Sequence, residues 1–153
     1  MEQYVQEINK KVSGAIEIVE KYREYNPDAQ HLSVVFDIDG TLLNDDKPIK
    51  PVVHLYNLCK QLGYTVFIVT ARDSIGITET INQLHNLGIN GFHSVYFRIP
   101  SVWNIVKFKA ACRKSVIDKG YYTVLTIGDQ SWDLAQEGEN EPGHGILLPQ
   151  LIF

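Results

Sequence analysis

Residues 32–43 read LSVVFDIDGTLL, and the prediction of the fold begins from this stretch. Its first part is a short apolar run rich in β-branched residues, which predicts a strand buried on both faces by flanking helices. Its second part places Asp37, Asp39 and Gly40 at the end of that strand. Similar runs recur along the chain. The predicted strands are 32–38 (LSVVFDI), 64–70 (YTVFIVT), 94–98 (SVYFR), 121–127 (YYTVLTI) and 146–148.

Amphipathic segments separate the predicted strands. Between residues 5 and 22 apolar side chains recur at steps of three and four, the spacing of one helix face, and Pro27 ends this helix. Gly63, Gly88 and Gly120 follow three later segments, as is usual just past the end of a helix. The later predicted helices are 51–62, 77–87, 102–119 and a short one near 131–137.

This alternation of strands and helices determines the expected architecture. Parallel strands joined by helices need right-handed crossovers, so the sheet lies between layers of helices. We predict an α/β fold with a doubly wound, Rossmann-like, mostly parallel sheet and helices on both faces. A chain of 153 residues has the length of one domain. Residues 1–153 are therefore predicted to form a single domain, in which the N-terminal helix within residues 1–30 packs on the core.

The composition excludes several classes of protein. Fourteen Lys and Arg against 18 Asp and Glu give a net charge of −4, which argues against a domain that holds nucleic acid by bulk positive charge. No stretch approaches the roughly 20 apolar residues of a membrane span. Residues 1–11 lack the apolar middle of a signal peptide. We therefore predict a cytoplasmic or otherwise intracellular protein with no membrane partner.

Ligands of such folds bind beyond the carboxyl ends of the strands, so polar residues there are candidates for chemistry. Asp37 and Asp39 lie two apart in an extended run and point to the same side, where two carboxylates repel unless a cation or a proton intervenes. Taken alone, an Asp-Gly step fits a simple turn equally well. A calcium loop is excluded, because its required Gly and Glu positions hold Leu42 and Pro48.

Two further strands end in polar residues. Thr70 closes the second predicted strand, Asp129 follows the fourth, and Asp133 comes one helical turn later. With Asp37 and Asp39, these residues are expected to bring four carboxylates together at one edge of the sheet. Carboxylates with room for water and substrate oxygens suit Mg²⁺, and a phosphate group would complete the coordination.

A bound phosphate also needs a positive side chain, for which Lys107 and Lys109 are the candidates. At about 100° per residue, Lys109 lies at the edge of the buried stripe of its helix, whereas Lys107 points away from it. Lys109 also lies near the start of the helix, on the same edge of the sheet as the strand ends. We therefore predict that Lys109 binds the phosphate.

Four stretches, taken in order, resemble the motifs of the haloacid dehalogenase (HAD) superfamily phosphatases. They are DIDGTLL (37–43), IVTAR (68–72), Lys109 and GDQSWD (128–133), and the resemblance covers about residues 34–148. The chain is further similar to the capless class B and plant-type acid phosphatases, subfamily IIIB, in its N-terminal helix, its FKAACR stretch and its late Leu148-Pro149 pair. It departs from that subgroup at Gly40, where the usual first motif has Glu.

The resemblance implies a role for each residue at the strand ends. Asp37 is the expected nucleophile and Asp39 the general acid and base, while Thr70 and Lys109 bind the phosphoryl oxygens. Arg72 follows Thr70 closely enough to reach the substrate, so it is a further candidate for substrate binding. Asp39 has to be protonated when substrate binds, and neighbouring negative charges would favour that form.

The same resemblance implies a Mg²⁺ site. Its expected ligands are the side chain of Asp37, the backbone carbonyl of Asp39 and the side chain of Asp129, with Asp133 supporting the metal directly or through a neighbouring ligand. The predicted function is a Mg²⁺-dependent, acid phosphatase-like phosphomonoester hydrolase. It would act through an aspartyl phosphate on Asp37.

The spacing of the motifs leaves no room for a large cap domain. The interval from Asp39 to Thr70 holds one small flap and one helix, and that from Arg72 to Lys109 holds one helix and one strand. The active site is therefore expected to be open unless a second subunit covers it, and an open site admits bulky phosphomonoesters. The apolar tail at residues 147–153 fits internal packing or a homodimer, and the sequence leaves both open.

Three alternative functions stand beside the main prediction. A phosphatase of nucleic-acid or protein phosphate groups would use the same superfamily chemistry, although the acidic charge balance counts against nucleic acid. A receiver-like phosphorylation switch also places aspartates, a Thr and a Lys at strand ends, but its early acidic pair is adjacent rather than two apart. A phosphate-binding module without catalysis would carry the same residues in a less productive geometry.

Overall fold

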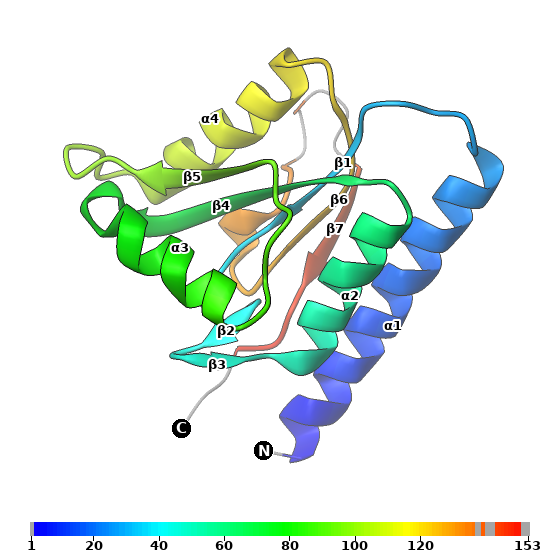
Figure 1. The fold of residues 1–153 in the computed structure, drawn as a ribbon, viewed down its shortest axis with the longest axis horizontal. Helices are drawn as coiled ribbons and strands as arrows, with labels where there is room; N and C mark the ends of the chain where they lie inside the picture. The colour runs from blue at the N-terminus through cyan, green and yellow to red at the C-terminus, as the bar shows by residue number, and fades with distance from the viewer. Residues whose placement is uncertain (1, 137–138, 140–142, 151–153) are drawn as a thin grey trace.

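The computed structural model describes residues 2–136, 139 and 143–150 (Figure 1). A five-stranded, parallel sheet runs through its centre in the order β5-β4-β1-β6-β7. Its strands are β1 (Leu32–Phe36), β4 (Thr65–Asp73), β5 (Ser94–Arg98), β6 (Tyr122–Gly128) and β7 (His144–Leu147). The helices are α1 (Glu2–Tyr25), α2 (Lys50–Gln61), α3 (Ile77–Asn86) and α4 (Ile105–Asp118). The predicted α/β fold with a parallel sheet is confirmed.

The strand order separates two kinds of doubly wound sheet. Numbered along the chain, the five strands have the spatial order 3-2-1-4-5. This is the Rossmann type of order, and it differs from the order 2-1-3-4-5 of flavodoxin and of receiver domains. β1 lies in the middle of the sheet, so the residues that follow it have neighbours from both β4 and β6.

Alternation along the strands divides the core in two. Val34 and Phe36 of β1 belong to the large cluster that contains α1 and α2, whereas Val35 belongs to a smaller cluster with α4. Successive strand residues point to opposite faces, so the central strands are buried on both sides. Accordingly, α1 and α2 cover one face of the sheet and α4 covers the other (Figure 1).

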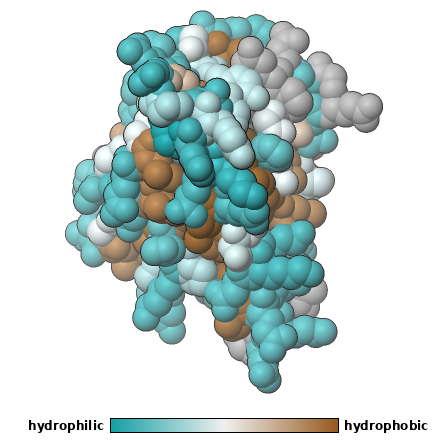
Figure 2. Space-filling view, turned by 90° about the vertical axis from the view of Figure 1, so that its right-hand side faces the viewer, coloured by the Kyte–Doolittle hydropathy of each residue, from teal (hydrophilic) through white to brown (hydrophobic). Residues whose placement is uncertain are grey.

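The N-terminal helix α1 packs against α2 and the strands β6 and β7. Its buried residues are Ile8, Val12, Ala15 and Val19. The hydroxyl of Tyr64, just before β4, donates a buried hydrogen bond of 2.7 Å to the carbonyl of Val19. Figure 2 views the molecule from the side of α1 and shows mostly hydrophilic residues with apolar residues exposed between them.

A small antiparallel hairpin follows β1, as the expected flap. It consists of β2 (Leu43–Asn44) and β3 (Lys47–Pro48). Leu42 and Leu43 are fully buried and anchor the hairpin in the core. Asp45 at its turn has a positive φ of 56° and is exposed.

Several element bounds differ from the sequence prediction around the site, among them the end of β1 at Phe36, the start of α4 and the end of β4. The helix predicted from residue 102 begins at Ile105, because the side chain of Asn104 accepts a hydrogen bond of 3.0 Å from the backbone of Lys107 and so caps the first turn. β4 extends past Thr70 to Asp73, where it still pairs with β5.

The helix predicted near residues 131–137 is wrong over the residues that the structure describes. A single turn of 3-10 helix, Ser131–Asp133, takes its place, and Leu134 is already extended. The backbone N–H of Ala135 donates to the hydroxyl of Thr126 in β6 at 3.2 Å, which draws the chain back to the sheet instead of onward along a helix.

No large cap interrupts the fold within residues 2–136, all of which are described. In that part and the other described residues, no helix is both long and apolar enough to cross a membrane. Of the apolar tail, Leu148 is 2% exposed and belongs to the main core, while residues 151–153 lie outside the described residues.

The packing of α1 can be tested by truncating one buried side chain. Ile8 is 2% exposed, so Ile8→Ala should lower the free energy of unfolding by about 2–5 kcal/mol. Val5 on the same helix is 48% exposed, so Val5→Ala should change it by less than about 0.5 kcal/mol. Urea denaturation of both variants measures the difference, and equal losses would contradict the observed face of α1.

Candidate active site

The register of the central strands assembles the site. Phe36 of β1 pairs with Ile68 of β4 and with Ile127 of β6. Asp37, Thr70 and Asp129 follow these paired residues within two positions, so all three lie at the carboxyl edge of the sheet. This is the edge where doubly wound folds bind their ligands.

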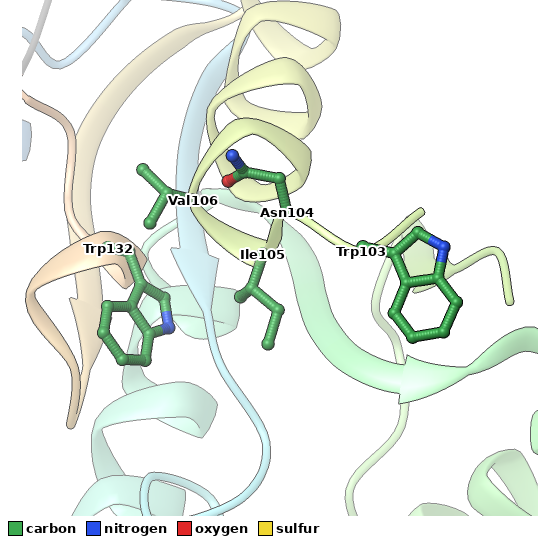
Figure 3. A pocket seen from close by; sticks show the side chains of 5 residues that line it. All are labelled: Trp103, Asn104, Ile105, Val106 and Trp132. Carbon is green, nitrogen blue, oxygen red and sulfur yellow. The ribbon is translucent and has the colours of Figure 1, made fainter. Parts of the chain in front are cut away.

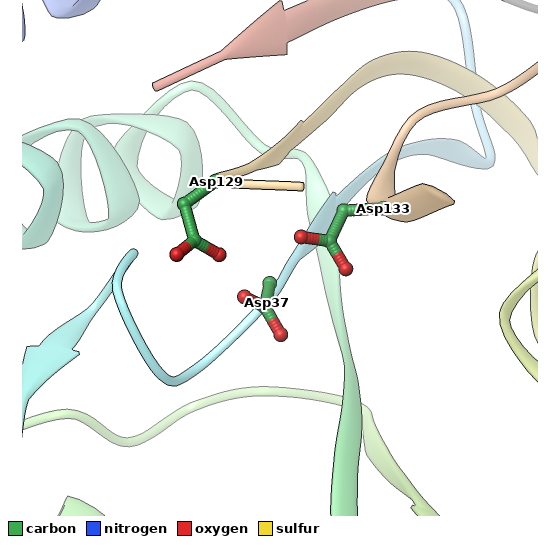
Figure 4. A group of neighbouring side chains, drawn as sticks. All are labelled: Asp37, Asp129 and Asp133. Atoms are coloured by element: carbon green, nitrogen blue, oxygen red, sulfur yellow. The ribbon is translucent and has the colours of Figure 1, made fainter. Parts of the chain in front are cut away.

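Three carboxylates converge at this edge. Asp37, Asp129 and Asp133 each offer one oxygen such that all three atoms lie within 4.8 Å of one another. We call these residues the three-carboxylate group, and Figure 4 shows their side chains pointing toward one another. Asp37 is 8% exposed and Asp133 is 5% exposed, so two of the three acids are buried.

Two glycines allow these acids to approach so closely. A Cβ on Gly40 would lie 2.1 Å from Oδ2 of Asp129, and Gly40 also has a positive φ of 77°. A Cβ on Gly128 would lie 2.2 Å from the Cβ of Asp133. Any other residue at either position would displace a carboxylate of the three-carboxylate group, so the backbone itself forms the cradle of this site.

Lys109 supplies the positive charge. Its ammonium lies 2.8 Å from Oδ1 of Asp37 and 2.7 Å from Oδ1 of Asp133, and it donates to the carbonyl of Val69 at 3.0 Å. The contact with Asp133 is an ion pair without hydrogen-bond geometry, since that oxygen has no hydrogen-bond partner among the described residues. Lys109 is 2% exposed and Lys107 is exposed, so the two lysines lie on the predicted faces of their helix, and phosphate binding by Lys109 stays a prediction.

The other oxygens of the buried acids have protein donors. The backbone N–H of Gln130 donates to Oδ2 of Asp133 at 3.0 Å, and the hydroxyl of Thr41 donates to Oδ2 of Asp37 at 3.2 Å. Both oxygens of Asp133 are thus engaged by the protein. Thr41 was missed by the sequence reasoning, although a hydroxyl four residues after a candidate nucleophile was a usable signal.

Burial shapes the protonation of the group. It raises the pKa of Asp37 from an ordinary value of 3.8 to about 7, against the opposing charge of Lys109. Burial and the charge of Asp133 raise the pKa of Asp129. Burial favours the neutral form of Lys109, but the carboxylates of Asp37 and Asp133 outweigh it, so the pKa of Lys109 is raised. The charged forms of the acids therefore need more positive charge than Lys109 provides.

These residues fit a hard divalent cation. The donor set consists of carboxylate oxygens, which Mg²⁺ prefers, and one ammonium group cannot balance three carboxylates. The cradle formed at Gly40 and Gly128 brings the oxygens into range of one ion. The structure therefore supports a metal-binding group made of Asp37, Asp129 and Asp133.

Asp39 does not join the three-carboxylate group, so the expectation that four carboxylates converge is wrong. The guanidinium of Arg72 binds it in a bidentate pair, with Nε 2.9 Å from Oδ2 and Nη2 2.7 Å from Oδ1. The side chain of Asp39 is 57% exposed. Its closest charged partner is therefore a cation, and not the neighbouring negative charges expected from the sequence.

The remaining predicted residue at the strand ends is Thr70. It is 1% exposed, and its Oγ1 accepts a hydrogen bond of 3.0 Å from the backbone N–H of Arg72. The ammonium of Lys109 donates to the carbonyl of the preceding residue, Val69, at 3.0 Å. Arg72 shares the edge of the sheet but contacts Asp39 rather than the three-carboxylate group.

A pocket of about 510 Å³ is formed at the start of α4 and at Trp132. Trp103, Asn104, Ile105, Val106 and Trp132 line it (Figure 3). Trp132 immediately precedes Asp133, and Ile105 lies one helical turn before Lys109, so two of the lining residues are close in sequence to residues of the site. Trp103 is 88% exposed.

Comparison with known families identifies the chain. Residues 44–152 match the family described as HAD superfamily, subfamily IIIB (Acid phosphatase). The chain belongs to this family. The matched range includes Thr70, Lys109, Asp129 and Asp133, and it begins after Asp37 and Asp39. The resemblance read from the sequence motifs is confirmed.

Two similar relatives in this family are plant proteins. Vegetative storage protein 2 of Arabidopsis thaliana is 31% identical over 103 residues, which cover 66% of this chain and 37% of the relative. Vegetative storage protein 1 of the same plant is 30% identical over 102 residues, with the same coverage. The chain thus spans little more than a third of the length of these curated relatives.

Solved structures share the fold. The class C acid phosphatase from Bacillus anthracis with tungstate bound superposes with a TM-score of 0.72 at 12% identity, covering 99% of this chain and 79% of that one. The Pnkp1/Rnl/Hen1 complex contains a chain with a TM-score of 0.70 at 18% identity, with coverage of 82% and 48%. These likenesses confirm the HAD-like α/β fold of this acid phosphatase family member.

The cradle at Gly40 predicts a specific loss. Gly40→Ala should weaken Mg²⁺ binding by at least about tenfold, because the new Cβ displaces the carboxylate of Asp129. Gly88 has the same φ of 77° but no atom within 4 Å of its virtual Cβ. Gly88→Ala should therefore cost a similar backbone strain of about 1 kcal/mol and leave Mg²⁺ binding unchanged. Calorimetric titration with Mg²⁺ compares the two, and equal affinities would contradict the cradle.

The raised pKa of Asp37 predicts a pH-dependent stability without metal. Between about pH 4 and pH 7 the folded protein binds more protons than the unfolded chain, so this contribution to stability is lost as the pH rises through about 7. In chelator, the melting temperature of the wild type should therefore fall relative to that of Asp37→Asn over this range. Thermal melts of both proteins test this, and a difference that stays constant with pH would contradict it.

Proposed function

We propose that this protein is a Mg²⁺-dependent phosphomonoester hydrolase that acts through an aspartyl phosphate on Asp37. The single observation that carries the proposal is the position of Asp37, at the end of the central strand, within the three-carboxylate group and 2.8 Å from the ammonium of Lys109. Membership of the acid phosphatase family supports the same reaction.

In the first step, an oxygen of Asp37 attacks phosphorus and the bond from phosphorus to the leaving oxygen breaks. Asp39 gives its proton to that oxygen, so an alcohol leaves. In the second step, water attacks the aspartyl phosphate, Asp39 takes a proton from the water, and inorganic phosphate and the free Asp37 carboxylate result. Splitting one difficult displacement into two easier ones is the advantage of a covalent nucleophile.

Charge is the main obstacle in this reaction, since a carboxylate must approach an anionic phosphate. The side chains of Asp37 and Asp129 and the backbone carbonyl of Asp39 would hold Mg²⁺, with Asp133 supporting the metal directly or through a neighbouring ligand. When bound, Mg²⁺ supplies positive charge to the phosphoryl oxygens. Lys109 lies beside Asp37 and adds the second positive charge at the same place.

Thr70 and Lys109 are the proposed binding residues for the phosphoryl oxygens. Thr70 lies in β4 and Lys109 lies in α4. Both side chains are almost fully buried, and polar contacts are stronger in the low dielectric of a protein interior. In the structure each also has protein partners, so a bound phosphate would exchange some of these contacts for its own oxygens.

The substrate is proposed to be a phosphomonoester of unrestricted bulk, because no cap is inserted within residues 2–136 and Asp39 is 57% exposed. We further propose that residues 1–153 act as one domain. The strand order argues against the receiver-like switch. The net charge of −4 gives no support to a phosphatase of nucleic-acid ends.

Hydrolysis of p-nitrophenyl phosphate by the purified protein tests the proposal. The wild type should turn over with Mg²⁺ and lose activity in chelator, and Asp37→Asn should lose at least about 10³-fold of kcat, because it removes the nucleophile at constant size. Val5→Ala is the control, since Val5 is 48% exposed on α1 and is not among the proposed catalytic, binding or metal-ligating residues.

Two outcomes would contradict the hydrolase proposal. Activity retained by Asp37→Asn would remove Asp37 as the nucleophile. A wild type that accepts a beryllofluoride adduct on Asp37 but shows no turnover of any phosphomonoester would instead indicate a switch or a phosphate-binding module.

A further inference from the structure

The carboxylate of Asp39 is held from one side only. Its two hydrogen bonds among the described residues both come from Arg72, through Nε at 2.9 Å and Nη2 at 2.7 Å. With a side chain 57% exposed, Asp39 has little packing to restrict its rotation. A bidentate guanidinium fixes both the distance and the plane of a carboxylate. The orientation of Asp39 therefore depends on Arg72.

Arg72 is in turn held by α3. Its Nη1 donates to the side-chain oxygen of Gln83 at 2.7 Å and to the hydroxyl of Thr80 at 3.3 Å. Thr80 is 4% exposed, which ties this contact to the core. Gln83 also donates to the carbonyl of Asp45 in the flap at 3.3 Å. Contacts with α3, which itself contacts the flap, therefore fix the position of the Arg72 guanidinium.

The donors of Arg72 are largely used by these contacts. A guanidinium has five N–H groups, and the contacts with Asp39, Thr80 and Gln83 engage four of them. Little donor capacity is left for the oxygens of a phosphate. Lys109 differs from Arg72 in this respect, because its ammonium lies directly against the carboxylate of Asp37.

We propose that Arg72 is a positioning residue that fixes the carboxylate of Asp39 apart from the three-carboxylate group, so that proton transfer at the leaving oxygen depends on Arg72 without a contact from Arg72 to the phosphoryl group. This inference rests on the proposed phosphatase function. It replaces the substrate-binding role expected for Arg72 from its place after Thr70.

Two substrates with different leaving groups can distinguish a role of Arg72 in positioning Asp39 from a role in binding the phosphoryl group. An alkoxide leaves only with a proton, whereas p-nitrophenolate leaves without one. Arg72→Met should therefore lower kcat/KM for glycerol 2-phosphate by about 10²-fold, the scale of general acid catalysis, and kcat/KM for p-nitrophenyl phosphate by less than about fivefold. The inhibition constant of inorganic phosphate should stay within about twofold, and Arg72→Lys should recover part of the lost activity because it can restore one ion pair.

Arg98 provides a matched control. It is a partly buried arginine at the end of the neighbouring strand β5, and it donates only to the carbonyls of Ala71 and Val102 among the described residues, each at 3.0 Å. Arg98→Met should lower the stability of the protein but change kcat/KM for the two substrates by the same factor.

A double variant checks that Arg72 acts through Asp39. Asp39→Asn should show the same preference for the nitrophenyl ester as Arg72→Met, and the combined variant should lose no more than Asp39→Asn alone. Additive losses would overturn the inference. So would equal losses on both substrates with weaker inhibition by phosphate, which would assign Arg72 to the phosphoryl group. A wild type that hydrolyses neither substrate would defeat the phosphatase function itself.

Discussion

Three carboxylates and one ammonium group lie together at a buried edge of the sheet, and the balance of their charges governs the pairing and protonation of the site. A buried charge is costly unless it is paired. Lys109 pairs with two of the acids, Asp37 and Asp133, and this leaves the group with more negative than positive charge. Burial accordingly raises the pKa values of Asp37 and Asp129. A cation at this place would let the acids remain ionised.

The backbone is adapted to this charge cluster. The register of β1 with β4 and β6 sets the heights of Asp37, Thr70 and Asp129, and no side chain at Gly40 or Gly128 obstructs the acids. Because a Cβ at Gly40 would meet the carboxylate of Asp129, the Glu usual in related first motifs would require another arrangement here. The glycine in this motif is therefore part of the site and not only of a turn.

Two acids that are two residues apart have opposite surroundings. Asp37 is buried against Lys109, whereas Asp39 is exposed and paired with Arg72. Acids in different environments take different roles in catalysis, and this is the condition for one to serve as nucleophile while the other moves protons. The division is produced by the turn after β1 and by α3, which holds Arg72 through Thr80 and Gln83.

The order of strands and helices, the parallel sheet and the candidate residues at the strand ends could all be predicted from the amino-acid sequence. Apolar periodicity and the punctuation by Pro and Gly are local signals, and they sufficed to choose Lys109 over Lys107. Local signals failed at residues 131–136, where a single 3-10 turn is followed by extended backbone and Ala135 donates to the hydroxyl of Thr126 in β6.

The contacts among these side chains could not be predicted from the sequence and are seen only in the folded protein. The pairing of Asp39 with Arg72, of Lys109 with Asp133, and of Thr41 with Asp37 joins residues whose directions depend on turns and on neighbouring elements. A pattern of residue types shows that a carboxylate lies at the end of a strand. Its partner is set by charge and packing across the sheet edge, because contacts between distant segments exist only after the chain has folded.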